Sequence, residues 1–172
     1  MWSIFPSLGG GIYFITFIDD FSHYGRVFIL KNKSGALAAF QMYKNESETG
    51  TGYSLKTLRS DRGGEYLNTL FDEELRRNGI IRQLTNPWTP EQNGVAECLN
   101  RTLIEMVLAL LTESGLPKSF WVEALCTAMY IRNCVLTCSV AGKTPFEAWF
   151  GVKPSVEHFR VWGSCCYVLR DH

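Results

Sequence analysis

The alternation of apolar and polar positions along the chain predicts an α/β protein. Residues 12–18 are apolar and rich in β-branched and aromatic side chains, which is typical of a buried strand. Turn-forming residues at 19–25 separate this run from a second apolar run at 26–30, so the two together predict a β-hairpin. Shorter strands are predicted at 53–60 and 80–85.

Helical spacing of apolar residues predicts helices at 36–44, at 68–78, from about 94 to 113, and at 119–135. Ser34 is expected to cap the first of these, residues 45–52 are expected to form a loop, and a short capped turn is expected at 144–151. Residues 159–162 and 165–169 are expected to be strands or extended segments. The order β-β-α-β-α-β-α-α predicts a single α/β domain.

Composition narrows the possible partners. The chain has 172 residues, 46% of them apolar, and a formal net charge of zero, so nucleic acid would have to be bound by a local site. No apolar run approaches the roughly 18 residues of a membrane span, and the start does not resemble a signal peptide. The six cysteines form no CxxC pair; we expect reduced, buried thiols in an intracellular protein, with a disulfide framework as the weaker alternative.

Two carboxylates stand out by their positions. Asp61 ends a predicted strand just before Gly63 and Gly64, where active-site residues of α/β proteins gather. Glu97 lies on a predicted helix, opposite an apolar stripe. That stripe comprises Val95, Leu99, Leu103, Met106 and Leu110. Each carboxylate has a structural alternative: Asp61 can bind backbone N–H groups of a turn, and Glu97 can pair with Arg101.

Together the two carboxylates predict metal chemistry. One hard carboxylate from a strand and one from a helix can share Mg²⁺, which prefers oxygen ligands and keeps several waters. Two such ions, roughly 4 Å apart, would hold the attacking and leaving oxygens of a phosphodiester during an in-line displacement. No protein nucleophile is needed for that reaction.

Several segments resemble a known family. Residues 58–66 (LRSDRGGEY), 89–97 (TPEQNGVAE) and 100–102 (NRT) are similar to the integrase catalytic core of Ty1/copia-type LTR retrotransposons, within the retroviral integrase superfamily. Residues 13–22, 116–124, 144–151 and 159–164 match further segments of that family in the same order, so the resemblance covers nearly the whole chain. The 35 residues between Asp61 and Glu97 fit the D-x(35)-E half of the family's acidic triad.

The resemblance implies a ribonuclease-H-like fold with a mixed central sheet flanked by helices, with the core at about 9–115 and a copia-type extension at 116–172. It implies Mg²⁺- or Mn²⁺-dependent trimming of element cDNA 3′ ends and their joining to target DNA. Asp61 and Glu97 would be the catalytic, metal-binding residues. The resemblance places nucleic-acid contacts at Gln92, Asn93, Gly94, Asn100 and Arg101. The implied partners are double-stranded DNA and, for the full-length protein, further copies of the same protein. The implied location is the nucleus, where the protein would act on chromosomal DNA. No membrane partner is implied.

The chain departs from the family pattern at its start. The family's first acidic residue lies on a strand upstream of the turn at 9–11, and residues 1–6 resemble only the stretch after that strand. We therefore expect an N-terminally truncated core that lacks this central strand and its Asp. Its absence would separate the hairpin from the strand that ends at Asp61. Asp19 and Asp20 match the end of the second strand and are expected to form a turn.

Two interpretations stay open. The chain is either an incomplete enzyme core or a non-catalytic remnant, a nucleic-acid-binding module of a retrotransposon polyprotein. Cys98, which stands where family members often carry a basic residue, weakens one phosphate contact. A third class, a hydrolase built around His23, has no nucleophile motif to support it.

Overall fold

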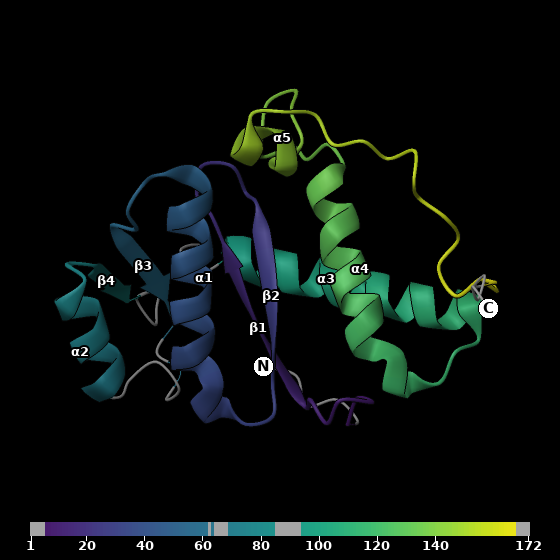
Figure 1. Ribbon diagram of the computed structural model, residues 1–172, viewed down its shortest axis with the longest axis horizontal. Helices are drawn as coiled ribbons and strands as arrows, with labels where there is room; N and C mark the ends of the chain where they lie inside the picture. The colour runs from purple at the N-terminus through teal and green to yellow at the C-terminus, as the bar shows by residue number, and fades with distance from the viewer. Residues whose placement is uncertain (1–5, 62, 64–68, 85–93, 168–172) are drawn as a thin grey trace, which may run out of the picture.

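The computed structural model describes residues 6–61, 63, 69–84 and 94–167 (Figure 1). The predicted order of elements is confirmed. The strands are β1 (Tyr13–Ile18), β2 (Gly25–Leu30), β3 (Thr57–Ser60) and β4 (Ile81–Leu84). The helices are α1 (Ala36–Thr51), α2 (Thr69–Arg77), α3 (Gly94–Ser114), α4 (Trp121–Cys134) and α5 (Pro145–Phe150). Short 3₁₀ turns at Lys33–Gly35 and Lys118–Phe120 precede α1 and α4.

The strands form two separate two-stranded sheets. β1 and β2 are antiparallel, with Tyr13 opposite Leu30, whereas β3 and β4 are parallel, with Thr57 opposite Ile81. In place of one mixed central sheet, the described ranges contain one antiparallel and one parallel pair of strands. Within the described ranges no strand joins β1 to β3, so the hairpin is separated from the strand before Asp61, as the sequence predicts.

The hairpin forms a layer between helices, because side chains along a strand alternate between its two faces. Ile15 and Phe17 point into a cluster shared with α1, while Phe14 and Ile18 pack against α3 and α4. Figure 1 shows α1 on one side of the hairpin and α4 on the other. The mostly apolar sequence of β1 follows from this two-sided burial.

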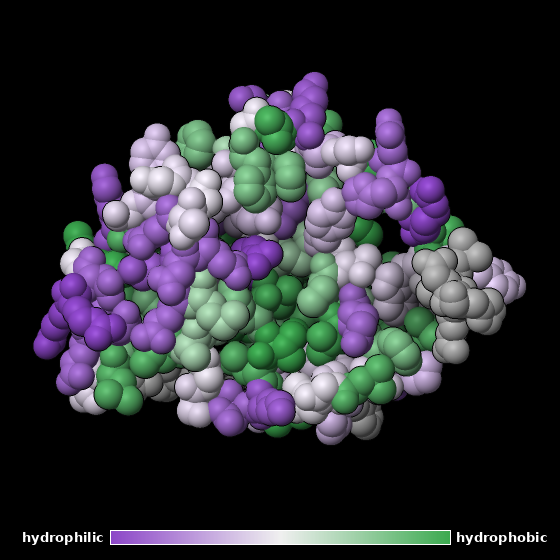
Figure 2. All heavy atoms as spheres, in the orientation of Figure 1, coloured by the Kyte–Doolittle hydropathy of each residue, from purple (hydrophilic) through white to green (hydrophobic). Residues whose placement is uncertain are grey.

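Helix α1 connects the two sheets. Its Phe40 is fully buried and contacts Phe17 of β1 and Phe71 of α2, with ring centroids 6.1 and 5.2 Å apart. Leu58 of β3 joins the same cluster. In Figure 2 the outer surface over α1 and α2 is polar, and apolar side chains are visible between α1 and α4, over the hairpin. The position of β3 relative to β1 therefore depends on α1.

Some local predictions are wrong. α1 continues to Thr51 instead of ending at residue 44, because Tyr43 and Ser47 extend its buried face into the polar stretch. Its N-cap is Gly35, since Ser34 lies in the preceding 3₁₀ turn. Val95 is 42% exposed and lies outside the buried stripe of α3. Of the two alternatives for residues 159–162 and 165–169, strands are not formed within 159–167, and 168–169 lie outside the described residues.

The cysteines are free, as expected, but they are not generally buried. Only Cys134 is buried and the other five are exposed, which corrects the prediction of buried thiols for Cys98 and Cys126. These two lie on helix faces turned away from the cluster that α3 and α4 share. Among the described helices, none combines the length and apolar character needed to cross a membrane.

Candidate active site

The gap between the two sheets forms a cleft of about 900 Å³. Residues 14–17 of β1 and 58–61 at the end of β3 line it, and the first half of α3 supplies a further wall. Asp61 and Glu97 both line this cleft. The two carboxylates that the sequence singles out, 36 positions apart, thus border one cavity, one at a strand end and one on a helix.

Asp61 follows the last residue of β3 and is exposed. Its Oδ1 accepts a hydrogen bond from the backbone N–H of Gly63 at 3.0 Å. The turn-forming role considered for this residue is therefore real, and it involves one carboxylate oxygen. An aspartate fixed in this way at a strand end has a defined orientation beside the cleft.

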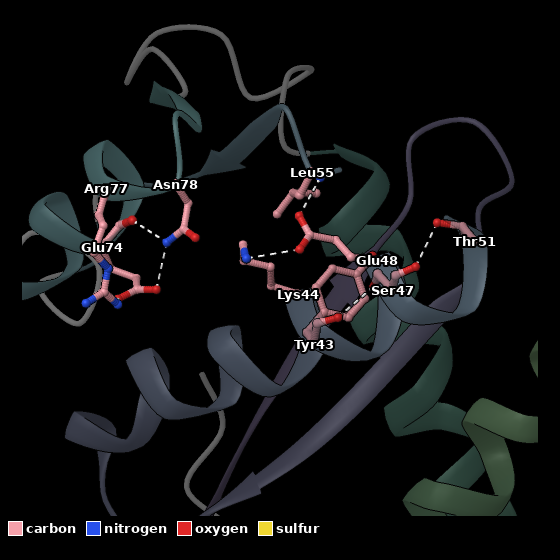
Figure 3. Close-up of polar contacts among 9 residues, drawn as sticks. All are labelled: Tyr43, Lys44, Ser47, Glu48, Thr51, Leu55, Glu74, Arg77 and Asn78. Atoms are coloured by element: carbon pink, nitrogen blue, oxygen red, sulfur yellow. Dashed lines mark hydrogen bonds and ion pairs between the residues drawn. The ribbon is translucent and has the colours of Figure 1, made fainter. Parts of the chain in front are cut away.

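The start of β3 is held by α1. The Glu48 carboxylate accepts the Leu55 N–H at 2.9 Å and pairs with Lys44 at 3.0 Å (Figure 3). The hydrogen bond from Leu55, followed by that from Lys44, lowers the pKa of Glu48. At the end of α2, Asn78 donates to the backbone carbonyl oxygen of Glu74 at 2.8 Å, which terminates that helix before β4.

Two further residues of β3 face the gap in different ways. Arg59 lies 3.5 Å from the carboxylate of Asp20, which follows β1, so a long ion pair spans the two sheets at the surface. Ser60 is buried, and its hydroxyl has no hydrogen-bond partner in the described part of the chain. A buried hydroxyl without a partner is costly, and its presence in the cleft wall fits an occupant with polar groups.

Glu97 lies in the first turn of α3 and is exposed. The side chains of Leu99, Leu103 and Val107 bury the other face of the helix. Over the described ranges, no ion pair joins Glu97 to Arg101, so the surface-pair alternative for Glu97 is not realised. A carboxylate in the first helical turn is favoured by the positive end of the helix dipole.

The other residues predicted for the site divide into two groups. Gly94, Asn100 and Arg101 line the cleft beside Glu97, whereas Gln92 and Asn93 lie outside the described residues, as does most of the loop before α3. Asn100 also accepts a hydrogen bond from the Thr16 hydroxyl at 2.9 Å. Thr16 is a cleft residue that sequence motifs do not indicate, although a lone threonine in an apolar strand is a signal for it.

Asp19 and Asp20 do not add to the pair of carboxylates in the cleft. Asp19 Oδ2 accepts from both the N–H and the hydroxyl of Ser22 at 2.7 Å, the turn role that the sequence predicts. Asp20 is 82% exposed and faces Arg59. No cluster of three or more His, Cys, Asp or Glu side chains suited to a metal ion occurs within the described residues.

Three known proteins that are similar in sequence to the chain are all of one kind. Pol polyproteins of retrotransposons are similar to the chain: TNT 1-94 of Nicotiana tabacum is 44% identical over 91% of the chain, and RE2 of Arabidopsis thaliana is 34% identical over 90%. Ty1-DR4 of Saccharomyces cerevisiae is 32% identical over 70%. The chain spans only 12%, 10% and 8% of the length of these relatives. No protein-family model matches it.

Two solved structures share the fold. An intasome of simian T-cell lymphotropic virus, in complex with a PP2A regulatory subunit, matches 98% of the chain and 57% of the solved chain, with a TM-score of 0.67 and 17% identity. The HTLV-2 integrase catalytic core domain, solved with magnesium in a trimeric form, matches 78% of the chain and 82% of its own length, with a TM-score of 0.59 and 20% identity.

The fold is therefore that of a retroviral integrase catalytic core, which is ribonuclease-H-like. The chain belongs to the retrovirus-related Pol polyproteins of retrotransposons, and it corresponds to the integrase segment that its motifs indicate.

Proposed function

We propose that this chain is part of the catalytic core of a retrotransposon integrase, acting in DNA integration, and that Asp61 and Glu97 are two of its metal-binding carboxylates. The observation that carries the proposal is that both residues line one cleft between the two sheets. The homologous Pol polyproteins and the integrase-core fold support it. On this proposal residues 9–115 are the core and 116–172 an extension of it, in which α4 packs against α3.

The donor atoms in the cleft suit a hard divalent ion. Mg²⁺ binds through one or two carboxylates and keeps several waters, which two carboxylates from opposite walls can satisfy. The HTLV-2 core that shares this fold was solved with magnesium. Asp61 and Glu97 would hold Mg²⁺ or Mn²⁺. When bound, such an ion stabilises charge on the phosphate oxygens during strand cleavage and transfer.

The residues around the carboxylates have supporting roles in this proposal. Gly63 orients Asp61 through its N–H, and the first turn of α3 presents Glu97. Arg101 lies one turn further along the cleft wall, where a guanidinium would contact a DNA phosphate. Because the net charge is zero, we expect weak DNA binding by this chain alone, with further copies and further segments of the polyprotein supplying affinity.

Metal binding and DNA-end processing test the proposal. We expect Mn²⁺ to bind the chain, and Asp61→Asn and Glu97→Gln each to abolish binding, with Glu113→Gln, an exposed carboxylate near the far end of α3, as a control that binds normally. Strand transfer on labelled DNA ends should require a form that also supplies the family's first acidic residue. Unchanged Mn²⁺ binding in both site variants would refute the proposed metal site.

A non-catalytic nucleic-acid-binding module is the second candidate. It is favoured by one observation, that no group of three metal-binding side chains is present in the described ranges. If a longer form that carries the family's first acidic residue still shows no metal-dependent cleavage but does bind DNA, this second function replaces the first. Activity of the 172-residue chain that is lost on Asp20→Asn would instead identify Asp20 as the first carboxylate.

A further inference from the structure

Thr16 is an exception in the strand that carries it. β1 reads YFITFI, and the face of β1 toward α3 and α4 carries Phe14, Thr16 and Ile18. Phe14 and Ile18 pack into the apolar cluster of α3 and α4. Thr16 therefore places a hydroxyl in a helix–strand interface that is otherwise apolar.

The hydroxyl of Thr16 has a specific partner on α3. It donates to Asn100 Oδ1 at 2.9 Å, across 84 positions of sequence, in a partly buried setting. The neighbouring contacts of α3 are made by Leu99 and Leu103, whose apolar side chains fit more than one alignment of a helix on a strand. A directional hydrogen bond between partly buried polar groups favours one alignment.

We propose that the Thr16–Asn100 pair fixes the register of α3 on β1 and thereby positions Glu97; this inference rests on the metal-site role proposed above. Asn100 lies three residues after Glu97, so the two side chains occupy the same helix face, and both line the cleft. Sliding α3 by one turn would move Glu97 by about 5.4 Å. Metal–oxygen distances of about 2.1 Å leave no room for such a shift.

The neighbouring helix has an independent anchor. Asn133 of α4 is buried, accepts the Gly25 N–H at 3.0 Å and donates to the Gly25 carbonyl oxygen at 2.8 Å. This pair holds α4 on the first residue of β2. Because Asn133 does not contact α3 through these bonds, its loss should weaken the fold without changing the register of Glu97. It therefore separates a general loss of stability from a loss of positioning.

The first experiment follows Mn²⁺ by paramagnetic broadening in NMR spectra of the ¹⁵N-labelled chain. In the wild type, the amide signals of Gly63 and of residues around Glu97 should broaden with the same Mn²⁺ midpoint concentration. Thr16→Val should raise that midpoint about three- to tenfold, as expected for one lost hydrogen bond. It should also give the signals near Gly63 and those near Glu97 different midpoints. Thr16→Ser, which keeps the hydroxyl, should behave like the wild type.

Two control variants sharpen the result. Thr127→Val removes a hydroxyl that bonds within α4, to the Glu123 carbonyl oxygen at 2.9 Å, and should leave the midpoint unchanged. Asn133→Ala should lower the melting temperature and leave the ratio of the two broadened sets unchanged. An unchanged midpoint in Thr16→Val, while Glu97→Gln abolishes binding, would overturn the positioning role and leave the proposed function intact.

A second measurement needs no metal. NOEs between the Phe14 ring and the methyl groups of Leu99 and Leu103 report the alignment of α3 on β1 directly. We expect a single set of NOEs in the wild type and in Thr16→Ser, and altered or averaged NOEs in Thr16→Val and Asn100→Leu. Identical NOEs in all four proteins would refute the register role whether or not the wild type binds Mn²⁺. Absence of common Mn²⁺ broadening in the wild type would count against the proposed metal site instead.

Discussion

The hairpin half of the molecule (β1, β2, α3 and α4) and the β3–β4 half (β3, β4 and α2) differ in how extensively they are packed. In the first, β1 and β2 are six residues long and pack against α3 and α4 around the fully buried Trp121 and Leu103. In the second, β3 and β4 have four residues each, and Ile81 of β4 is 63% exposed. The second half therefore depends more on its neighbours for stability.

This difference matters because each half carries one carboxylate. Glu97 lies on α3, in the well-packed half, whereas Asp61 ends β3, in the weaker half. α1 joins them through the cluster around Phe40. Since local stability varies across a protein, the distance between the two carboxylates should respond first to changes in α1 and the β3–β4 half.

The largest expected effect comes from filling the gap between the halves. The edges of β1 and β3 that face the cleft have no strand partner in the described ranges. We expect the 172-residue chain to fold with reduced stability, because unpaired edges and buried polar groups each carry a cost. Fusing the segment that precedes the matching region of the TNT 1-94 relative ahead of Met1 should raise the unfolding free energy by about 5 kcal/mol, since several ladder hydrogen bonds form together.

Denaturant unfolding followed by circular dichroism measures this gain, and a scrambled version of the fused segment is the matched control. Equal stability of the two fusions would show that the gap is not a site for strand pairing. A monomeric, cooperatively melting wild type with the stability of the fusion would show that the two sheets need no further strand.

Truncating one aromatic residue in each half should show that the two halves lose stability independently. Trp121→Ala and Phe71→Ala each remove a fully buried ring and should cost about 3–5 kcal/mol. Hydrogen exchange should then differ by region: Phe71→Ala should expose the amides of β3 and β4 first, and Trp121→Ala those of α3 and α4. Uniform loss of protection in both variants would mean that the halves unfold as one unit and do not differ in stability.

The sequence predicts the hairpin half of the architecture better than it predicts α1, which links the hairpin to β3. The long apolar run of β1 and the spacing of Leu99 and Leu103 predict the hairpin and α3 well, because burial on both sides leaves a clear pattern. The end of α1 is mispredicted because the hydroxyls of Ser47 and Thr51 donate hydrogen bonds to backbone carbonyl oxygens one turn back. These bonds let polar residues remain helical.

The sequence singles out two carboxylates that line one cleft in the structure, Asp61 and Glu97, and their role in metal binding stays a prediction. Nothing local to either residue reveals that Thr16 contacts Asn100 or that Glu48 binds Leu55. Such contacts join positions distant in sequence, or a side chain and a backbone group across a loop. They depend on the packed arrangement of elements, which periodicity does not specify.

A smaller effect should appear at high pH through α1. Tyr43 stacks on Phe17 with ring centroids 4.8 Å apart, and burial raises the pKa of Tyr43 to about 12. A raised folded-state pKa contributes stability that is present below the unfolded value, near 10, and is lost as pH rises through 12. The loss should reach about 3 kcal/mol. Tyr43→Phe should show a shallower decline in unfolding free energy between pH 10 and 12; equal slopes would contradict the assignment.

The smallest effect should come from the contact that ties β3 to α1. Glu48→Gln weakens the bond to the Leu55 N–H and removes the pair with Lys44, and solvent screening should limit the loss to about 1 kcal/mol at pH 7. The pKa of Glu48 is lowered in the folded state, so its contribution is present above the ordinary carboxyl pKa and disappears as pH falls through the folded value. Wild type and Glu48→Gln should therefore converge in stability at acid pH. Glu46→Gln, which removes a surface pair with Arg26 at 2.5 Å, is the control and should change the protection of the Leu55 amide much less. Equal effects of the two variants on that amide would show that α1 does not hold β3 through Glu48, and that the link between the halves lies in the apolar cluster alone.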